Sequence, residues 1–179
     1  LTDVGSRVEK EPPMTTPVRT GFSGLQIALH WTIAALVLFQ LVFGESMTAT
    51  VEAAEDGVTP SASDQLLGQL HYWVGLSILL LVFVRIAVRL RRGAPTRLAE
   101  PKLFSWMASW IHGLFYALLV AVPSSGLLGY YLGDPWGELH SWGKPVFIAA
   151  IAGHVAAALF HQFWIRDATL RRMFVPEAR

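Results

Sequence analysis

The stretch LQIALHWTIAALVLFQLVFG, residues 25–44, carries no charged side chain over twenty consecutive positions. Roughly 20 predominantly apolar residues are enough for an α-helix to cross the hydrocarbon core of a bilayer. The apolar residues of this stretch do not alternate with polar ones, as those of a membrane β-strand would. The stretch therefore predicts a membrane-spanning helix.

The composition of the whole chain agrees with a membrane protein. Of its 179 residues, 53% are hydrophobic and only 15% are charged, and the mean hydropathy is +0.44. This length suits a single domain. The chain has no cysteine. That excludes disulfides, thiolate-bound zinc or iron–sulfur sites and covalently attached c-type haem, but it leaves ligation by histidine open.

Further apolar runs of spanning length occur at 70–84 (continuing to about Leu90), 103–133 and 139–165. Together with the first run they predict an all-α membrane protein, built as a bundle of four transmembrane helices. We expect one domain over residues 21–175. Residues 1–20 are polar and lack the apolar core of a signal peptide, so they are predicted to form a disordered tail.

The charges between the apolar runs predict how the bundle is oriented. The connection 45–69 contains five acids and no Lys or Arg, whereas 85–102 and the C-terminal tail are rich in arginine. Short loops that carry an excess of Lys and Arg stay on the cytoplasmic side. We therefore expect both termini and 85–102 in the cytoplasm, and 45–69 and 132–142 on the outer face.

All six histidines of the chain lie within or at the edge of a predicted span, and every span contributes at least one. An ionisable side chain in a bilayer is costly and is usually functional. One such histidine can be explained by a hydrogen bond between helices, but that explanation is poor for a set of six. The six residues are His30, His71, His112, His140, His154 and His161.

Spacing and depth sort these histidines. His140, His154 and His161 are separated by fourteen and seven residues, so they share one face of a helix with 3.6 residues per turn. His71 and His140 lie at the same outer depth on different helices. The other four histidines lie in the inner half, and depth alone does not say which of them pair.

Paired histidines on facing helices are typical axial ligands of a b-type haem, and a haem can fill the core of a helical bundle. Two haems stacked across the membrane would form a path for electrons. Arg85 and Arg89, near the inner end of the second span, fit either haem propionates or quinone, or an ordinary role as cytoplasmic anchors.

One stretch in each span resembles the bacterial cytochrome b561 family: LQIALHW, LHYWVGLSILLLVFVRIAVRL, IHGLFYALLVAVPSSGLL and GHVAAALFHQFWIRDATLRRM. The last is the most specific of the four. The resemblance extends over about residues 21–175. It implies a four-helix protein of the bacterial inner membrane that holds two b haems and exchanges electrons with ubiquinone or menaquinone.

By position, the resemblance implies that His71 and His140 ligate an outer haem and that His30 and His154 ligate an inner one. It also places His112 and His161 near an inner quinone site. Arg19, just before the first span, is a further candidate for holding a quinone carbonyl.

One position departs from relatives that oxidise superoxide, which tend to carry a lysine just before the outer histidine of the fourth span. Here Glu138 stands there and Lys144 follows His140 by four residues. The acidic outer connections should repel a small anion and attract a cation. We therefore expect a basic partner, such as a c-type cytochrome, a periplasmic dehydrogenase or a larger membrane complex, although acids that merely keep loops solvated give the same pattern.

The predicted function is transmembrane electron transfer between a periplasmic redox partner and membrane quinone, a quinone-linked oxidoreductase activity whose direction the sequence leaves open. The alternatives within the family are a passive haem-bearing anchor of a larger complex and a superoxide:quinone oxidoreductase. A transporter with histidine relays would be expected to carry acids inside its spans, where this chain has none. A purely structural bundle leaves the histidines unexplained.

Overall fold

The computed structural model of the chain describes residues 21–93 and 102–177. The predicted tail 1–20, including Arg19, lies outside the described residues. In the described part all regular structure is helical. The elements are α1 (Gly24–Phe43), α2 (Glu45–Glu55), α3 (Ala62–Arg92), α4 (Lys102–Leu132), α5 (Trp136–Ser141), α6 (Gly143–Phe160), the π-helical turn η1 (His161–Ile165) and the 3-10 turn η2 (Arg171–Met173).

Four stretches of these helices are long and apolar enough to cross a membrane, which confirms the predicted number of spans. Large apolar side chains cover their outside; Leu90 and Trp164, for example, are 79% and 80% exposed. So much exposed apolar surface would be unusual for a soluble monomer and suits contact with lipid. The four spans are Gly24–Phe43, Ala62–Arg92, Ser105–Leu132 and Trp136–Ile165.

Local sequence signals explain where the helices begin and end. Ser23 caps α1 reciprocally with Gln26: the Gln26 N–H donates to Ser23 Oγ, and the Ser23 N–H donates to Gln26 Oε1. Ser61 caps α3 through its side chain alone, which accepts a hydrogen bond from the Asp64 N–H. Gly93 follows α3 with a φ of +71°, a conformation that favours glycine.

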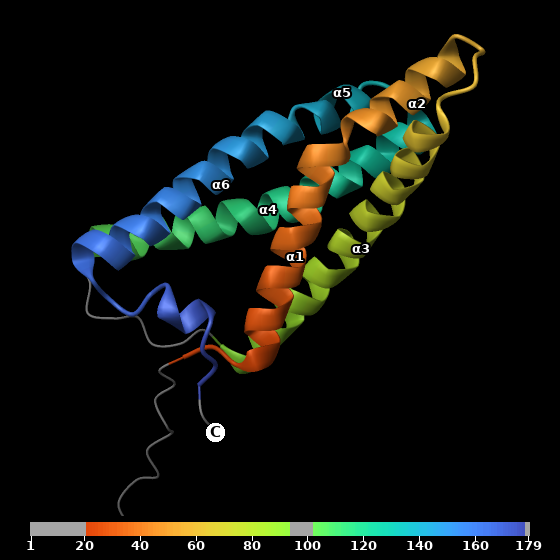
Figure 1. Ribbon diagram of the computed structural model, residues 1–179. Helices are drawn as coiled ribbons and strands as arrows, with labels where there is room; N and C mark the ends of the chain where they lie inside the picture. Colours follow the sequence, from red (N-terminus) through yellow and green to blue (C-terminus); the bar gives the residue numbers. More distant parts are fainter. Residues whose placement is uncertain (1–20, 94–101, 178–179) are drawn as a thin grey trace, which may run out of the picture.

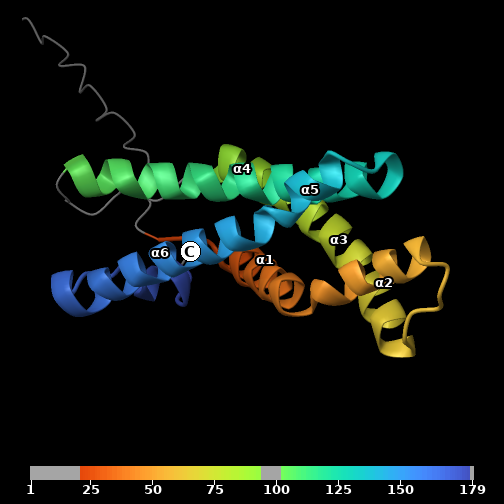
Figure 2. The ribbon, with the colours of Figure 1, turned by 90° about the horizontal axis from the view of Figure 1, so that it is seen from above.

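Among the spans, α1 packs along α3, and α4 contacts both α3 and α6. Figure 1 shows that the four spans meet near α2 and α5 and that α1 and α3 spread apart from α4 and α6 toward their other ends. Figure 2, seen from above, shows α3 passing close to α4 near α5. A small buried core joins all four spans at the crossing. It consists of Ile33, Val37, Ile78, Val82, Leu119 and Phe147.

The expected outer connection 45–69 contains more structure than a loop. Residues 45–55 form α2, and α3 begins at Ala62, about two turns before the apolar run that predicted it. The Thr50 hydroxyl lies within hydrogen-bond distance of the Ser46 and Asp64 carbonyls, at 2.8 and 3.0 Å. Similarly, the expected loop 132–142 contains α5. The helix α2 is too polar to register as a span, so hydropathy missed it. The helix α5 instead forms the start of the fourth span, three residues before the predicted run 139–165.

The fourth span runs through α5, α6 and η1 as one striped surface. Its less exposed positions recur every three or four residues, and all three histidines of the span belong to them. This agrees with the predicted single face. The stripe includes His140, Gly143, Phe147, Ala150, Ile151, His154, Ala158 and His161.

Candidate functional site

The outer histidines lie face to edge across the bundle. The ring centroids of His71 on α3 and His140 on α5 are 5.9 Å apart. A metal–imidazole bond is about 2 Å long, so two rings on opposite sides of one metal ion would have centroids about 6 Å apart. Both residues line a cavity of about 610 Å³ whose wall includes residues from α1 to α6. The structure thus brings together the pair predicted for the outer haem.

His140 is held in an orientation that suits a metal ligand. Its Nδ1 lies 2.8 Å from the Val122 carbonyl oxygen. A carbonyl only accepts, so Nδ1 carries the proton and Nε2 keeps its lone pair. Histidines that bind metals usually donate their second N–H in this way. Gly126 makes room for the ring, because a Cβ there would lie 2.8 Å from His140 Nδ1 and Cε1.

His71 lacks the hydrogen bond at Nδ1 that His140 makes, although a possible acceptor lies beside it. Among the described residues, His71 Nδ1 and Gln40 Oε1 are the buried side-chain polar atoms without a hydrogen-bond partner. Gln40 Nε2 donates to the His71 carbonyl at 2.8 Å, which keeps the amide beside the histidine. A histidine that binds metal through Nε2 carries its proton on Nδ1 and needs an acceptor. Gln40 Oε1 is such an acceptor, so the residues of this layer fit a histidine-ligated haem.

The inner layer centres on His154 of α6. Its ring centroid lies 6.4 Å from that of His30 on α1 and 5.7 Å from that of His112 on α4. The Phe115 ring contacts it from a third side, at 5.3 Å. Both inner pairings therefore satisfy the distance criterion, and the assignment of His30 with His154 stays a prediction.

Arginines of α3 lie at this inner layer. Arg85 Nη2 is 3.3 Å from His30 Nδ1, and its Nη1 donates to the Gln26 carbonyl at 3.4 Å. The guanidinium of Arg89 lies over the Tyr116 ring at 5.8 Å. Arg85 thus puts a fixed positive charge beside His30, where it can meet an anionic group of a bound molecule.

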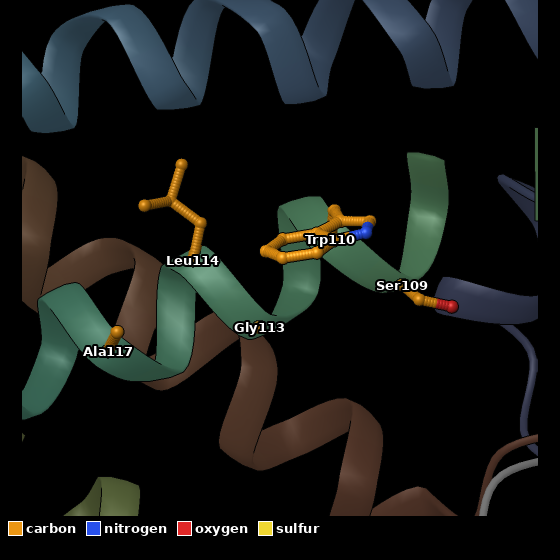
Figure 3. Close-up of a pocket in the computed structure, with 5 residues that line it drawn as sticks. All are labelled: Ser109, Trp110, Gly113, Leu114 and Ala117. Atoms are coloured by element: carbon orange, nitrogen blue, oxygen red, sulfur yellow. The ribbon is translucent and has the colours of Figure 1, made fainter. Parts of the chain in front are cut away.

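The two residues predicted near quinone have separate surroundings. His112 is exposed, and its Nδ1 lies 2.5 Å from the Ala108 carbonyl oxygen. Next to it, α4 carries a hollow of about 420 Å³, where Trp110 and Leu114 stand on either side of Gly113 (Figure 3). His161, in contrast, lies at the end of the fourth span and contacts a carboxylate that sequence reasoning did not select.

That carboxylate is Asp167, whose Oδ2 lies 2.6 Å from His161 Nδ1. Burial alone would raise the pKa of Asp167, but hydrogen bonds from the His161 ring and from the Thr169 hydroxyl and N–H together hold its pKa below the usual value. Gln40 was missed as well. For both residues the sequence offered only a polar side chain near an apolar span: Gln40 lies within the first span and Asp167 just after the fourth. Their contacts with histidines arise only when the chain is folded.

Acids gather at the outer mouth of the cavity. Glu45 and Lys144 form an exposed ion pair at 2.6 Å that ties the start of α2 to the start of α6. The hydrogen bond from Lys144 lowers the pKa of Glu45. The other carboxylates that line the cavity form no ion pair with any described residue, so the mouth has an excess of negative charge. They are Glu52, Glu55, Asp134 and Glu138.

The chain is similar to known proteins over most of its length. The family model described as prokaryotic cytochrome b561 matches residues 21–176. "Cytochrome b562" of Cereibacter sphaeroides is 36% identical over 157 residues, covering 87% of this chain and 96% of that protein. "Probable superoxide oxidase CybB" of Yersinia pestis is 25% identical over 181 residues, covering 88% and 97%. "Cytochrome b561 homolog 1" of Escherichia coli is 27% identical over 175 residues, covering 85% and 96%.

Proposed function

Because the chain belongs to the prokaryotic cytochrome b561 family of electron-transfer membrane cytochromes, which implies haem b, we propose that it carries electrons across a bacterial inner membrane. The electrons pass between a redox partner at the periplasmic face and quinone in the membrane. The observation that carries this proposal is the arrangement of histidine pairs in two layers, His71 with His140 and His30 with His154.

In this proposal each pair holds one b haem, which supplies a one-electron redox centre. The protein positions the pairs and keeps water from the space between them. Val37, Ile78, Leu119 and Phe147 line the inner side of the outer cavity and belong to the buried core. The Val122 carbonyl fixes the tautomer of His140, and Gln40 Oε1 can do the same for His71 by accepting from its Nδ1–H.

The charges favour an orientation with both termini in the cytoplasm. Arg85, Arg89, Arg91 and Arg92 occupy the end of α3 that lies beside the inner layer, whereas the acids gather near α2 and α5. The positive-inside rule then puts the inner layer on the cytoplasmic side. Quinone reacts there, near His112 and His161.

The acidic mouth favours a basic redox partner over an anionic substrate. A c-type cytochrome, a periplasmic dehydrogenase or a larger complex that uses this chain as its haem-bearing anchor all meet that condition. Superoxide oxidation is the second candidate, because one relative is named a probable superoxide oxidase. Lys144, the cation at the mouth, is however paired with Glu45.

The first test is the haem content of the purified protein, measured by a pyridine haemochrome assay together with a reduced-minus-oxidised spectrum. We expect two b haems per chain, and about one in His71→Ala and in His154→Ala, because each change removes one axial ligand. His30→Ala should lose the inner haem, whereas His112→Ala should keep both.

The same measurement can contradict the proposal. A wild-type protein without a Soret band would remove its basis. Full haem content in both His71→Ala and His154→Ala would show that the ligand assignment is wrong. Loss of haem in His112→Ala but not in His30→Ala would mean that His112, and not His30, ligates the inner haem together with His154.

A further inference from the structure

His161 and Asp167 form a pair that depends on the backbone conformation at the end of the fourth span. The fourth span ends in the π-helical turn His161–Ile165, and Arg166 then adopts a left-handed conformation with a φ of 57°. This reversal brings Asp167 back under His161, at 2.6 Å. Both side chains are only 15% exposed. A non-glycine residue in this conformation is uncommon and often marks a functional constraint.

The segment that carries Asp167 is fixed at its other end too. Trp31 Nε1 donates to the Met173 carbonyl at 2.8 Å, and the Trp31 and Phe174 rings lie 4.9 Å apart. The Glu177 N–H donates to the Phe22 carbonyl at 3.0 Å. Residues 166–177 therefore form a strap from the end of the fourth span to the start of α1, visible in Figure 1.

The pair has a defined polarity. The Thr169 N–H donates to Asp167 Oδ1 at 2.8 Å, which leaves Oδ2 facing the imidazole. A carboxylate only accepts, so His161 Nδ1 carries a proton and Nε2 keeps a lone pair directed away from the aspartate. A carboxylate in this place orients an imidazole and stabilises its protonated form, as in other histidine–carboxylate pairs.

We propose that Asp167 is a positioning residue for proton exchange with quinone, acting through His161. This inference rests on the proposed function. When quinone is reduced, the Nε2–H bond of protonated His161 breaks and an O–H bond forms on a quinone oxygen. One quinone takes two electrons, delivered through the haems, and two protons, so His161 is protonated again from the cytoplasmic side before the second transfer. Quinol oxidation uses the same atoms in reverse.

The charges around the pair suit this role. Asp167 and Glu177 are the only carboxylates after residue 138 in the sequence. His161 is the titratable group that acts electrostatically on Asp167. The other charged side chains of the strap before Glu177 are cationic: Arg166, Arg171 and Arg172. Asp167 is thus the counter-charge nearest to a protonated His161.

The test follows haem reduction by decylubiquinol in the haem-loaded protein between pH 5.5 and 9, with Asp167→Asn, Asp167→Glu and the control Glu177→Gln. We expect Asp167→Asn to slow reduction about tenfold or more, since a positioned acid–base group contributes about 10²–10⁴-fold. Without its counter-charge the imidazolium is less favoured. The rise of the rate with pH should therefore be displaced toward acid. Asp167→Glu should recover part of the rate, and Glu177→Gln should behave as wild type.

Haem content and the two midpoint potentials separate this role from a structural one, and we expect both to be unchanged in Asp167→Asn. A slower variant with the wild-type pH profile would overturn the role of Asp167 while leaving the proposed function intact. Equal effects of Asp167→Asn and Glu177→Gln would do the same. If decylubiquinol does not reduce the wild-type haems at all, the proposed quinone reaction fails, and the pair's role fails with it.

Discussion

At the scale of the residue, glycine decides where an imidazole can lie. A Cβ on Gly126 would lie 2.8 Å from two atoms of the His140 ring, whereas a Cβ on Gly113 would meet nothing within 4 Å. Both glycines are inside α4, where alanine is favoured over glycine by about 1 kcal/mol. The same substitution should therefore have opposite consequences at the two positions.

We predict that Gly126→Ala displaces His140 and reduces haem content by about one haem per chain, with the outer haem lost. Gly113→Ala should keep both haems and a wild-type or slightly higher thermal midpoint, because only helix propensity changes. Haemochrome assay and redox titration of the two variants check this. Equal haem content in both would mean that the His140 ring has another place to go.

The sequence predicted residues by type and depth more readily than residues by contact. His71 and His140 could be paired from depth, because each stands alone at the outer end of its span. His30 and His112 could not be separated, and in the structure both lie beside His154. Gln40 and Asp167 act on a histidine six or more positions away, through packing or a left-handed turn that no periodicity encodes.

At the scale of the element, the strap 166–177 depends on one ionised carboxylate. The pKa of Asp167 is lower in the folded chain than its ordinary value of 3.8. A group of this kind contributes stability that is fully present above the unfolded pKa and is lost as pH falls through the folded pKa. The strap should therefore stay attached at neutral pH and detach in acid.

This predicts a local transition at a pH below 3.8. Since the chain has no cysteine, Ala168→Cys can carry an environment-sensitive fluorophore as the sole label. Its emission should change in acid before the helical circular dichroism signal does. With Asp167→Asn added, emission should no longer change in acid before the helical signal, because the titrating carboxylate is gone. A single transition shared by both signals in both proteins would argue that the strap has no separate equilibrium.

Elements were predictable to the extent that they are apolar. The four spans followed from uncharged runs of sufficient length. The helix α2 did not, because its mixed polar sequence has no hydropathy signal and it is held by its neighbour, as Thr50 is by the Asp64 carbonyl of α3. The π-helical turn η1 likewise arises where the chain leaves the bundle.

At the scale of the whole molecule, the acidic mouth beside His71 and His140 would give the proposed electron path a negatively charged entrance. A basic partner should be steered to it, and salt should weaken that steering within a Debye length of about 10 Å at 0.1 M. An anion such as superoxide should respond in the opposite way.

We predict that haem reduction by a basic c-type cytochrome slows by about tenfold between 10 and 200 mM salt, consistent with steering contributions of about 10–10³ to association rates. Glu52→Lys with Glu55→Lys should slow it at low salt and largely abolish the salt dependence. The control is that the double variant keeps the haem content of the wild type. Reduction by superoxide at a high rate that is indifferent to salt would instead favour the second candidate function.

Because the histidines of the fourth span share one stripe, the number of residues between them fixes the face on which each lies. One residue inserted between His140 and His154 would turn everything beyond it by about 100° and advance it by about 1.5 Å. His154 and His161 would then leave the face that they share with His140. The one insertion would disrupt both the proposed haem site at His154 and the proposed quinone site at His161. Related chains should accordingly differ in length in the connections around 56–61 and 94–101. Between these three histidines the count of residues should stay the same even where their identities drift.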